Sequence, residues 1–178
     1  MRSASAADAP RRSRRAALLL VPVLITVHDA EEALAMPAAL RTLPARLPAS
    51  LAGLIPTVPQ FLAALAFVTV LPWVVWLLGV ARRETRTGIV LLLLMQAVML
   101  VNVASHAAAA IFLRGYAPGV ATALAFNLPF SVYLLRRALA ERWISRRTLL
   151  IIVAAAVLIH GPGILGAMWV AGRIAGGS

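Results

Sequence analysis

The chain has 178 residues, of which 62% are hydrophobic and 13% are charged, about half the charged fraction of an average soluble domain. It contains no cysteine, which excludes disulfide bonds and thiolate sites. All 17 basic residues are arginine and the net charge is +11, but the arginines stand in short clusters between apolar runs. That placement excludes a nucleic-acid interface and is typical of topology signals in a membrane protein.

The sequence predicts, in chain order, a basic arm, five membrane-spanning helices and a glycine-rich tail. Residues 1–15 are small, polar and basic, which predicts a disordered cytoplasmic arm. Apolar runs long enough to cross the hydrocarbon core predict helices over 16–36, 59–80, 88–113, 118–139 and 148–170. We therefore expect an all-α polytopic bundle, with residues 16–170 as its single membrane-embedded domain and residues 171–178 as a flexible tail.

A long connection, residues 37–59, follows the first predicted span and contains five prolines. Because proline cannot donate the backbone hydrogen bond of a helix interior, no continuous helix is expected there. Leucines nevertheless recur at steps of three and four, which indicates short amphipathic turns lying at the bilayer surface. This loop is expected to fold over the outer end of the bundle, either as a passive cover or as a functional lid.

The distribution of arginine predicts the orientation of the chain in the plasma membrane. The N-terminal arm, the connection between spans 2 and 3 and the connection between spans 4 and 5 hold 13 of the 17 arginines. By the positive-inside rule these segments are cytoplasmic, and an odd number of spans then places the C-terminus outside. Residues 11–27 also resemble a signal peptide, but the three acids just beyond them argue against cleavage.

The motif His28-Asp29-Ala30-Glu31-Glu32 holds one of the three histidines and three of the six acids of the chain. His28, Glu31 and Glu32 are spaced i, i+3 and i+4, so they share one face of the first predicted span. An ionised group inside a membrane costs about 2.5–3.5 kcal/mol even on lenient scales, so such groups are expected to be paired inside the bundle. An imidazole with two carboxylates is typical of half a metal site or of an acid–base pair.

Other polar residues of the predicted spans are expected to complete this site. With a rise of about 1.5 Å per residue, all three histidines fall in the outer half of the membrane. Asn102 and His106 share a face at i, i+4, and His160 stands beside a Gly-Pro-Gly helix break. Asn102 and Asn127 are expected either to join helices by hydrogen bonds or to bind substrate.

Three features in this order resemble the HXXEE domain family. They are the pattern His-x-x-Glu-Glu at residues 28–32, the second histidine His106, and Tyr-x-Pro-Gly at residues 116–119. The resemblance covers about residues 17–170. It marks His28, Glu31, Glu32, His106, Tyr116, Pro118 and Gly119. The family is regarded as integral membrane proteins of uncharacterised function with an enzymatic role, so the resemblance supplies no substrate.

We expect these residues to form a metal-dependent membrane enzyme, with a hydrolase as the simplest case. The predicted ligands of one divalent metal are His28, Glu31, Glu32, His106 and, as an optional member, His160. Zinc is the first choice because it accepts nitrogen and oxygen ligands with an open water position, and iron or manganese also suit the set. The glutamate that does not bind metal is expected to act as the general base.

The outer mouth of the site is expected to recognise substrate. Arg114 and Tyr116 stand before the fourth span, where they would bind negative charge, and Tyr116 is also a candidate catalytic residue. Pro118 suits the first turn of that span, whose N-terminus would attract an anion. A lipid-like or amphiphilic molecule from the outer leaflet is the expected substrate class, and the oligomeric state is left open.

Two other functions fit the same residues. Intramembrane histidine and glutamate side chains are used as proton relays, so a proton-coupled transporter or channel is one alternative. The polar residues crowd one half of the membrane instead of tracing a path across it, which argues against transport. A non-catalytic subunit of a membrane assembly is the second alternative.

Overall fold

The computed structural model describes residues 8–46 and 55–163, which form helices, turns and connections without a strand. The α-helices are α1 (Asp8–Thr42), α3 (Val58–Trp76), α4 (Arg86–Leu113), α5 (Val120–Thr122), α6 (Leu128–Ala140) and α7 (Arg146–Leu158). The shorter 3-10 or π segments are η1 (Leu43–Arg46), η2 (Leu77–Ala81), η3 (Ala123–Asn127) and η4 (Ile159–Gly163). The all-α prediction is confirmed for these residues.

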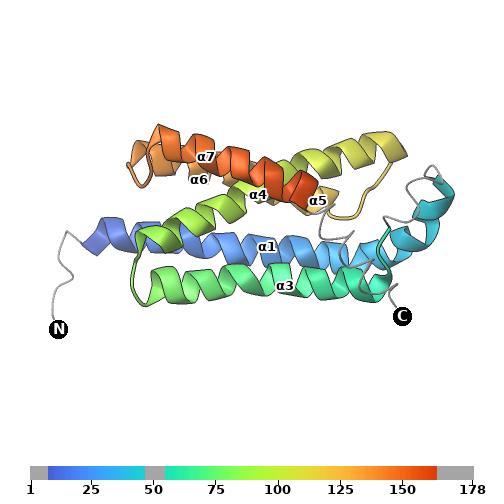
Figure 1. Ribbon diagram of the computed structural model, residues 1–178, viewed down its shortest axis with the longest axis horizontal. Helices are drawn as coiled ribbons and strands as arrows, with labels where there is room; N and C mark the ends of the chain where they lie inside the picture. Colours follow the sequence, from blue (N-terminus) through green and yellow to red (C-terminus); the bar gives the residue numbers. More distant parts are fainter. Residues whose placement is uncertain (1–7, 47–54, 164–178) are drawn as a thin grey trace.

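Segments that follow one another without a break combine into long rods, so that η2 extends α3, α5 and η3 lead into α6, and η4 extends α7. α1 and α3 run antiparallel side by side, and α4 crosses them obliquely (Figure 1). α6 and α7 both pack on α4. Among the described helices, Val58–Ala81 and Arg86–Leu113 are long and apolar enough to cross a membrane. These two support membrane association weakly, and five crossings stay a prediction.

α1 extends beyond its apolar run at both ends. It begins at Asp8, so residues 8–15 are helical and not a disordered arm. It also continues past Pro37 to Thr42, where the prolines predicted an end near residue 36. Alanine, leucine and methionine fill residues 33–40 around Pro37, and these strong helix formers offset the one backbone hydrogen bond that the proline removes. Residues 47–54 of the proline-rich loop lie outside the described residues.

Prolines in the later helices are accompanied by π segments instead of open breaks. η3 ends two residues before Pro129, and the Leu128 amide bonds to the Ala123 carbonyl. η4 contains Pro162. A π turn shifts the backbone pairing by one residue around a proline that cannot donate. Around Pro129 the rod is thus continuous through a wide turn, and the break predicted at the Gly-Pro-Gly segment is a π turn as far as Gly163. Such turns are frequent at functional sites.

An apolar core lies between α1, α4 and α6. Leu18 and Val21 of α1, Leu92 and Leu93 of α4 and Leu134 of α6 are all 0% exposed. These residues belong to one buried cluster, and those of α1 and α4 lie in the halves of their helices that begin at Asp8 and Arg86. The polar candidate residues lie toward the opposite end, so the two halves of the bundle differ in chemistry as the sequence predicts.

The arginine-rich segments gather at one end of the bundle (Figure 1). Arg11, Arg14 and Arg15 of α1 surround the carboxylate of Glu84, which stands in the connection between η2 and α4 and whose side chain is 2% exposed. Arg137 of α6 donates to the Ser13 hydroxyl at 2.7 Å. Three segments far apart in sequence are therefore joined at the end that the arginine distribution assigns to the cytoplasm.

At the opposite end, a tight connection links α4 to α5. α4 ends at Leu113, and its C-cap residue Arg114 adopts the left-handed conformation with φ 49°. The connection then passes through Tyr116 and the buried Ala117 to Gly119, whose φ is 84°. This path returns the chain toward α1 and delivers Gly119 and the start of α5 to the residues of the His-x-x-Glu-Glu motif.

Candidate metal centre

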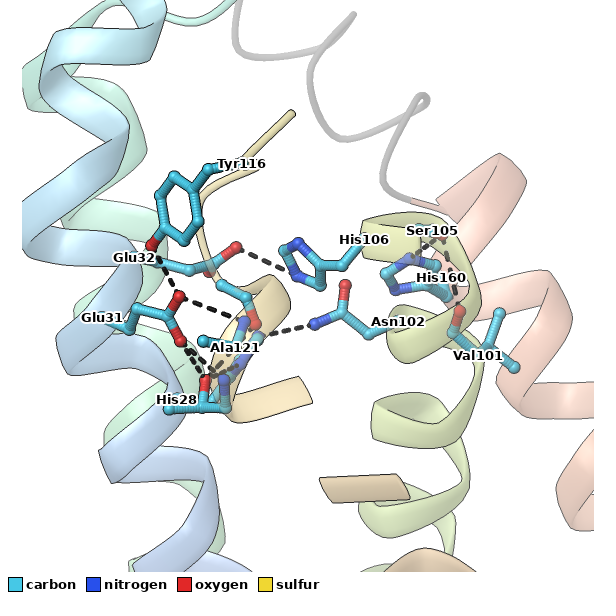
Figure 2. A network of polar contacts seen from close by, with 12 residues as sticks. His28, Glu31, Glu32, Val101, Asn102, Ser105, His106, Tyr116, Ala121 and His160 are labelled. Carbon is cyan, nitrogen blue, oxygen red and sulfur yellow. Dashed lines mark hydrogen bonds and ion pairs between the residues drawn. The ribbon is translucent and has the colours of Figure 1, made fainter. Parts of the chain in front are cut away.

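His28, Glu32 and His106 come together between α1 and α4 (Figure 2). Each offers one ligand atom, and these three atoms lie within 4.8 Å of one another. The imidazole rings of His28 and His106 meet edge to face, with their centroids 4.9 Å apart. His28 is 0% exposed, His106 is 8% exposed and the Glu32 side chain is 13% exposed. The cluster is the one group of three or more such residues found in the described part of the chain.

Helix spacing on two elements creates this cluster. His28 and Glu32 are one turn apart on α1, and Asn102 and His106 are one turn apart on α4, so each helix presents a pair to the other. Because α1 and α4 pack against each other, the two pairs meet. The i, i+4 pattern that the sequence shows on both helices is thus the local cause of the site.

The contact between His106 and Glu32 suits two ligands of a common ion. His106 Nε2 lies 3.3 Å from Glu32 Oε1, yet this buried nitrogen makes no hydrogen bond within the described residues. Two atoms bound to one zinc ion at about 2.1 Å in tetrahedral geometry are about 3.4 Å apart. An orphaned buried nitrogen is costly unless something binds it, so the residues present fit a divalent metal.

Gly119 forms a wall of the cluster. A Cβ added to Gly119 would lie 2.6 Å from His106 Cε1, 2.9 Å from His28 Cε1 and 3.0 Å from His106 Nε2. Its φ of 84° is also one that residues with a side chain rarely adopt. The position therefore requires glycine for two independent reasons, and the family motif that ends at Gly119 serves to bring bare backbone against both imidazoles.

Glu31 turns away from the cluster and caps the helix that begins after Gly119. Its carboxylate accepts hydrogen bonds from the amides of Ala121, at 3.3 Å, and Thr122, at 2.8 Å. It also accepts from the hydroxyls of Thr122 and Tyr116, each at 2.6 Å. Gly119 is the N-cap residue and has no side chain to satisfy these amides, so a carboxylate from α1 does so and matches the positive end of the helix.

The hydrogen bonds around His28 define its tautomer. Thr122 Oγ1 donates its single proton to Glu31, so at 2.8 Å it accepts from His28 Nδ1. His28 Nε2 then carries the lone pair and accepts from the Asn102 amide at 2.9 Å. Metal-binding histidines usually donate the other ring proton to a carboxylate, a carbonyl or a water, which fixes the ring orientation, and the Thr122 hydroxyl takes that place here. Nε2 is thus the His28 nitrogen able to bind a metal.

His160 does not join the cluster. Its Nε2 lies 2.9 Å from the hydroxyl of Ser105, on the outer surface of α4 (Figure 2). Ser105 precedes His106 in the chain, and successive residues of a helix point about 100° apart. This hydrogen bond ties η4 to α4, and the optional ligand role of His160 stays a prediction.

The predicted substrate-binding residues separate into different places. Asn102 contacts His28, and Tyr116, which is 58% exposed, stands at the open side with its hydroxyl on Glu31. Arg114 is the exposed C-cap of α4: its backbone amide donates to the Ile111 carbonyl at 3.1 Å, while its side chain makes no hydrogen bond or ion pair in the described ranges. Asn127 lies in η3 and is 0% exposed inside the bundle, and its role in substrate binding stays a prediction.

Thr122 is the site residue that sequence reasoning missed. Thr122 connects Glu31 to His28 through its hydroxyl, yet the residues next to Thr122 in the sequence are uncharged. Its position near the start of a predicted helix, where threonine often bonds to free amides, is the signal that points to it. For Gly119 the sequence offers only the family motif as a signal. The structure explains why glycine is needed there, because the rings of His28 and His106 leave no room for a Cβ.

The fold and the cluster define an all-α helical protein with a buried His/His/Glu group between two helices. The model of a protein family described as "Protein of unknown function with HXXEE motif" matches residues 19–134, and the chain belongs to this family. The match ends before α7, whereas the motifs suggested an extent to about residue 170, and it leaves His160 outside. No curated protein and no solved structure matches the chain.

Proposed function

We propose that the protein is an integral membrane metalloenzyme whose metal is held by His28, Glu32 and His106. The observation that carries this proposal is the convergence of three buried ligand groups, one of which has an otherwise unpartnered nitrogen. His106 Nε2 and Glu32 Oε1 lie at an ion-pair distance of 3.3 Å, but they form no hydrogen bond within the described residues. A cation would satisfy all three groups at once.

Zinc is the first candidate for this metal, with manganese and iron as the others. Two imidazoles and one carboxylate form a ligand set known in catalytic zinc sites, and the same set is used by non-haem iron. When bound, such a metal would supply a Lewis acid and lower the pKa of a coordinated water to about 7. Hydrolysis is the simplest reaction consistent with that chemistry.

The chain's own residues would hold the site and admit the substrate. Glu31 fixes the start of α5 and, through Thr122, orients the His28 ring, so it acts as a positioning residue and not as a ligand. Tyr116 stands exposed beside it and offers the first polar contact to a substrate entering from that side. The side-chain amide of Asn102 donates a hydrogen bond to His28 Nε2. Glu31 is engaged by four donors, which argues against its use as a free general base.

The substrate class that we propose is a lipid-like or amphiphilic molecule reaching the site from the outer leaflet. The cluster contacts Gly119 of the α4–α5 connection, which lies at the end of the bundle opposite to the arginine-rich segments. The positive-inside rule predicts that those segments are cytoplasmic. An outer position together with an exposed tyrosine at the mouth favours a molecule with a polar group near the membrane surface. The proposed location is the plasma membrane, with the N-terminus cytoplasmic and the C-terminus outside.

Metal content of the purified protein tests this proposal. Wild-type protein, purified in detergent without chelator and offered zinc, manganese or iron, should retain about one ion per chain. His28→Ala and His106→Ala should each lose it, because each removes a ligand. His160→Ala is the matched control: it removes a histidine bound to Ser105 and should keep the metal. A wild-type protein that binds none of the three metals contradicts the proposal.

One observation favours the proton-relay alternative. Tyr116, Glu31, Thr122, His28 and Asn102 form an unbroken chain of hydrogen bonds, in which both ring nitrogens of His28 are already engaged. Such a chain suits proton movement without a metal. Reconstitution into vesicles with a pH-sensitive dye distinguishes the two: proton flux in metal-free protein that Thr122→Val abolishes would establish the relay and displace the metalloenzyme.

A further inference from the structure

Two buried amide side chains lie outside the metal cluster. Gln96 of α4 and Asn127 of η3 are both 0% exposed. Ser131 of α6 joins them, because its hydroxyl accepts from Gln96 Nε2 at 2.7 Å and donates to the Asn127 backbone carbonyl at 2.6 Å. These three residues form a polar group between α4 and the η3–α6 rod, enclosed by the apolar core.

Most of the hydrogen-bonding capacity of this polar group is unused. Neither Asn127 Oδ1 nor Asn127 Nδ2 has a partner within the described residues, and the same is true of Gln96 Oε1. A buried amide without partners loses its hydration and gains nothing in return, which makes it strongly unfavourable. Three such atoms, on two residues that both contact Ser131, therefore indicate that something polar binds here.

We propose that Gln96, Asn127 and Ser131 form an internal hydration site that holds at least one water molecule. The unused atoms are two acceptors and one donor nitrogen, and water, which both donates and accepts, can satisfy all of them. No acidic side chain belongs to the group, so a cation would be bound by neutral oxygens alone. An apolar ligand would leave the three atoms unpartnered.

The position of the hydration site relates it to His28. Asn127 follows Thr122 by one π turn, and Thr122 and Asn102 both hold the His28 ring. A water bound by Asn127 thus extends the polar region inward from the metal cluster toward the middle of the bundle. The hydration site does not depend on a bound metal or on catalysis, so its test is independent of the proposed function.

Thermal unfolding of three variants tests the hydration site in metal-free protein. Asn127→Leu and Gln96→Met replace each amide by an apolar group of similar size, and the third variant carries both changes. If water satisfies the amides, each single change should lower the Tm by roughly 3–8 °C. The double change should cost less than the two single changes together, because both disrupt one water.

Leu93→Met is the matched control for these variants. It changes another fully buried side chain of α4 to methionine without loss of a polar contact, so its Tm shift reports repacking alone and should be smaller. An unchanged or raised Tm in Asn127→Leu would overturn the proposal, because an amide without partners costs nothing to remove. Additive losses would overturn it as well, since the two amides would then not share a water.

A second measurement on wild-type protein covers the case in which a variant does not fold. X-ray radiolysis creates hydroxyl radicals from bound water in place, and Met99 lies one turn from Gln96 on α4 and is 5% exposed. Rapid oxidation of Met99 is expected if water is bound beside Gln96. Protection of Met99 at a dose that oxidises exposed side chains would contradict the proposal.

Discussion

Gly119 is the residue on which the positions of both imidazoles depend. A methyl group at this position would overlap the rings of His28 and His106 and would require a backbone conformation that alanine disfavours. Gly119→Ala is therefore expected to lower the free energy of unfolding by about 2–4 kcal/mol and to reduce metal retention. Thermal unfolding and elemental analysis measure the two effects.

Gly115→Ala is the matched control for that change. Gly115 lies in the same connection, but a Cβ there would come no closer than 3.9 Å to Leu113 O. Its effect on the free energy of unfolding should stay within about 0.5 kcal/mol. Equal behaviour of the two variants would mean that Gly119 does not constrain the histidines.

Helical spacing predicts that His28, Glu31 and Glu32 share a face, but not which glutamate reaches His106. Residues i+3 and i+4 lie about 60° to one side and about 40° to the other side of residue i. Glu31 therefore meets the start of α5, while Glu32 meets α4. Which element packs against each side of α1 depends on the tertiary fold. The different contacts of Glu31 and Glu32, and the contact of Thr122 with Glu31, therefore could not be predicted from the sequence.

The helix ends at the arginine-rich end are joined by a charged contact at Glu84. Burial raises the pKa of Glu84, but the hydrogen bonds and charges of Arg14 and Arg11 lower it more, so its pKa lies below the ordinary 4.5. Glu84→Gln should lower the free energy of unfolding by about 1–3 kcal/mol, an estimate reduced for the partial exposure of the arginines. Glu141→Gln, in an exposed i, i+4 pair with Arg137, is the control and should cost less than about 1 kcal/mol.

The lowered pKa of Glu84 has a definite pH dependence. A carboxylate whose pKa is lower in the folded state stabilises the fold fully above its unfolded pKa of about 4.5, and this contribution disappears as the pH falls through the folded pKa. Wild-type protein should therefore lose more stability than Glu84→Gln when the pH is lowered from 6 toward 3. Parallel Tm curves for the two proteins would show that Glu84 makes no such contribution.

α1 shows where sequence patterns fail at the level of elements. Its arginines predicted a solvated arm and its prolines predicted an early end, yet the helix runs from Asp8 to Thr42. The arginines are paired with Glu84, which lies about 70 residues further along the chain. The sequence around the arginines gives no sign of this distant partner. The helix class, by contrast, was predictable because long apolar runs admit few alternatives.

The distribution of charge over the whole molecule predicts one membrane orientation. The basic segments that gather at one end (Figure 1) should face the cytoplasm, with the α4–α5 connection outside. Reporter fusions after Arg86, after Arg114 and at Ser178 check this, with cytoplasmic signal at the first and external signal at the other two. Cytoplasmic signal at Ser178 would exclude five spans.

The two motif glutamates provide the most direct test of the central claim, which is that Glu32 binds metal and Glu31 positions the site. Glu31→Gln and Glu32→Gln are isosteric changes at neighbouring positions, and bound metal per chain is measured for each after identical purification. We predict that Glu32→Gln loses metal, while Glu31→Gln retains it and unfolds at a lower temperature because the cap of α5 is weakened. Loss of metal from Glu31→Gln with retention in Glu32→Gln would contradict the account.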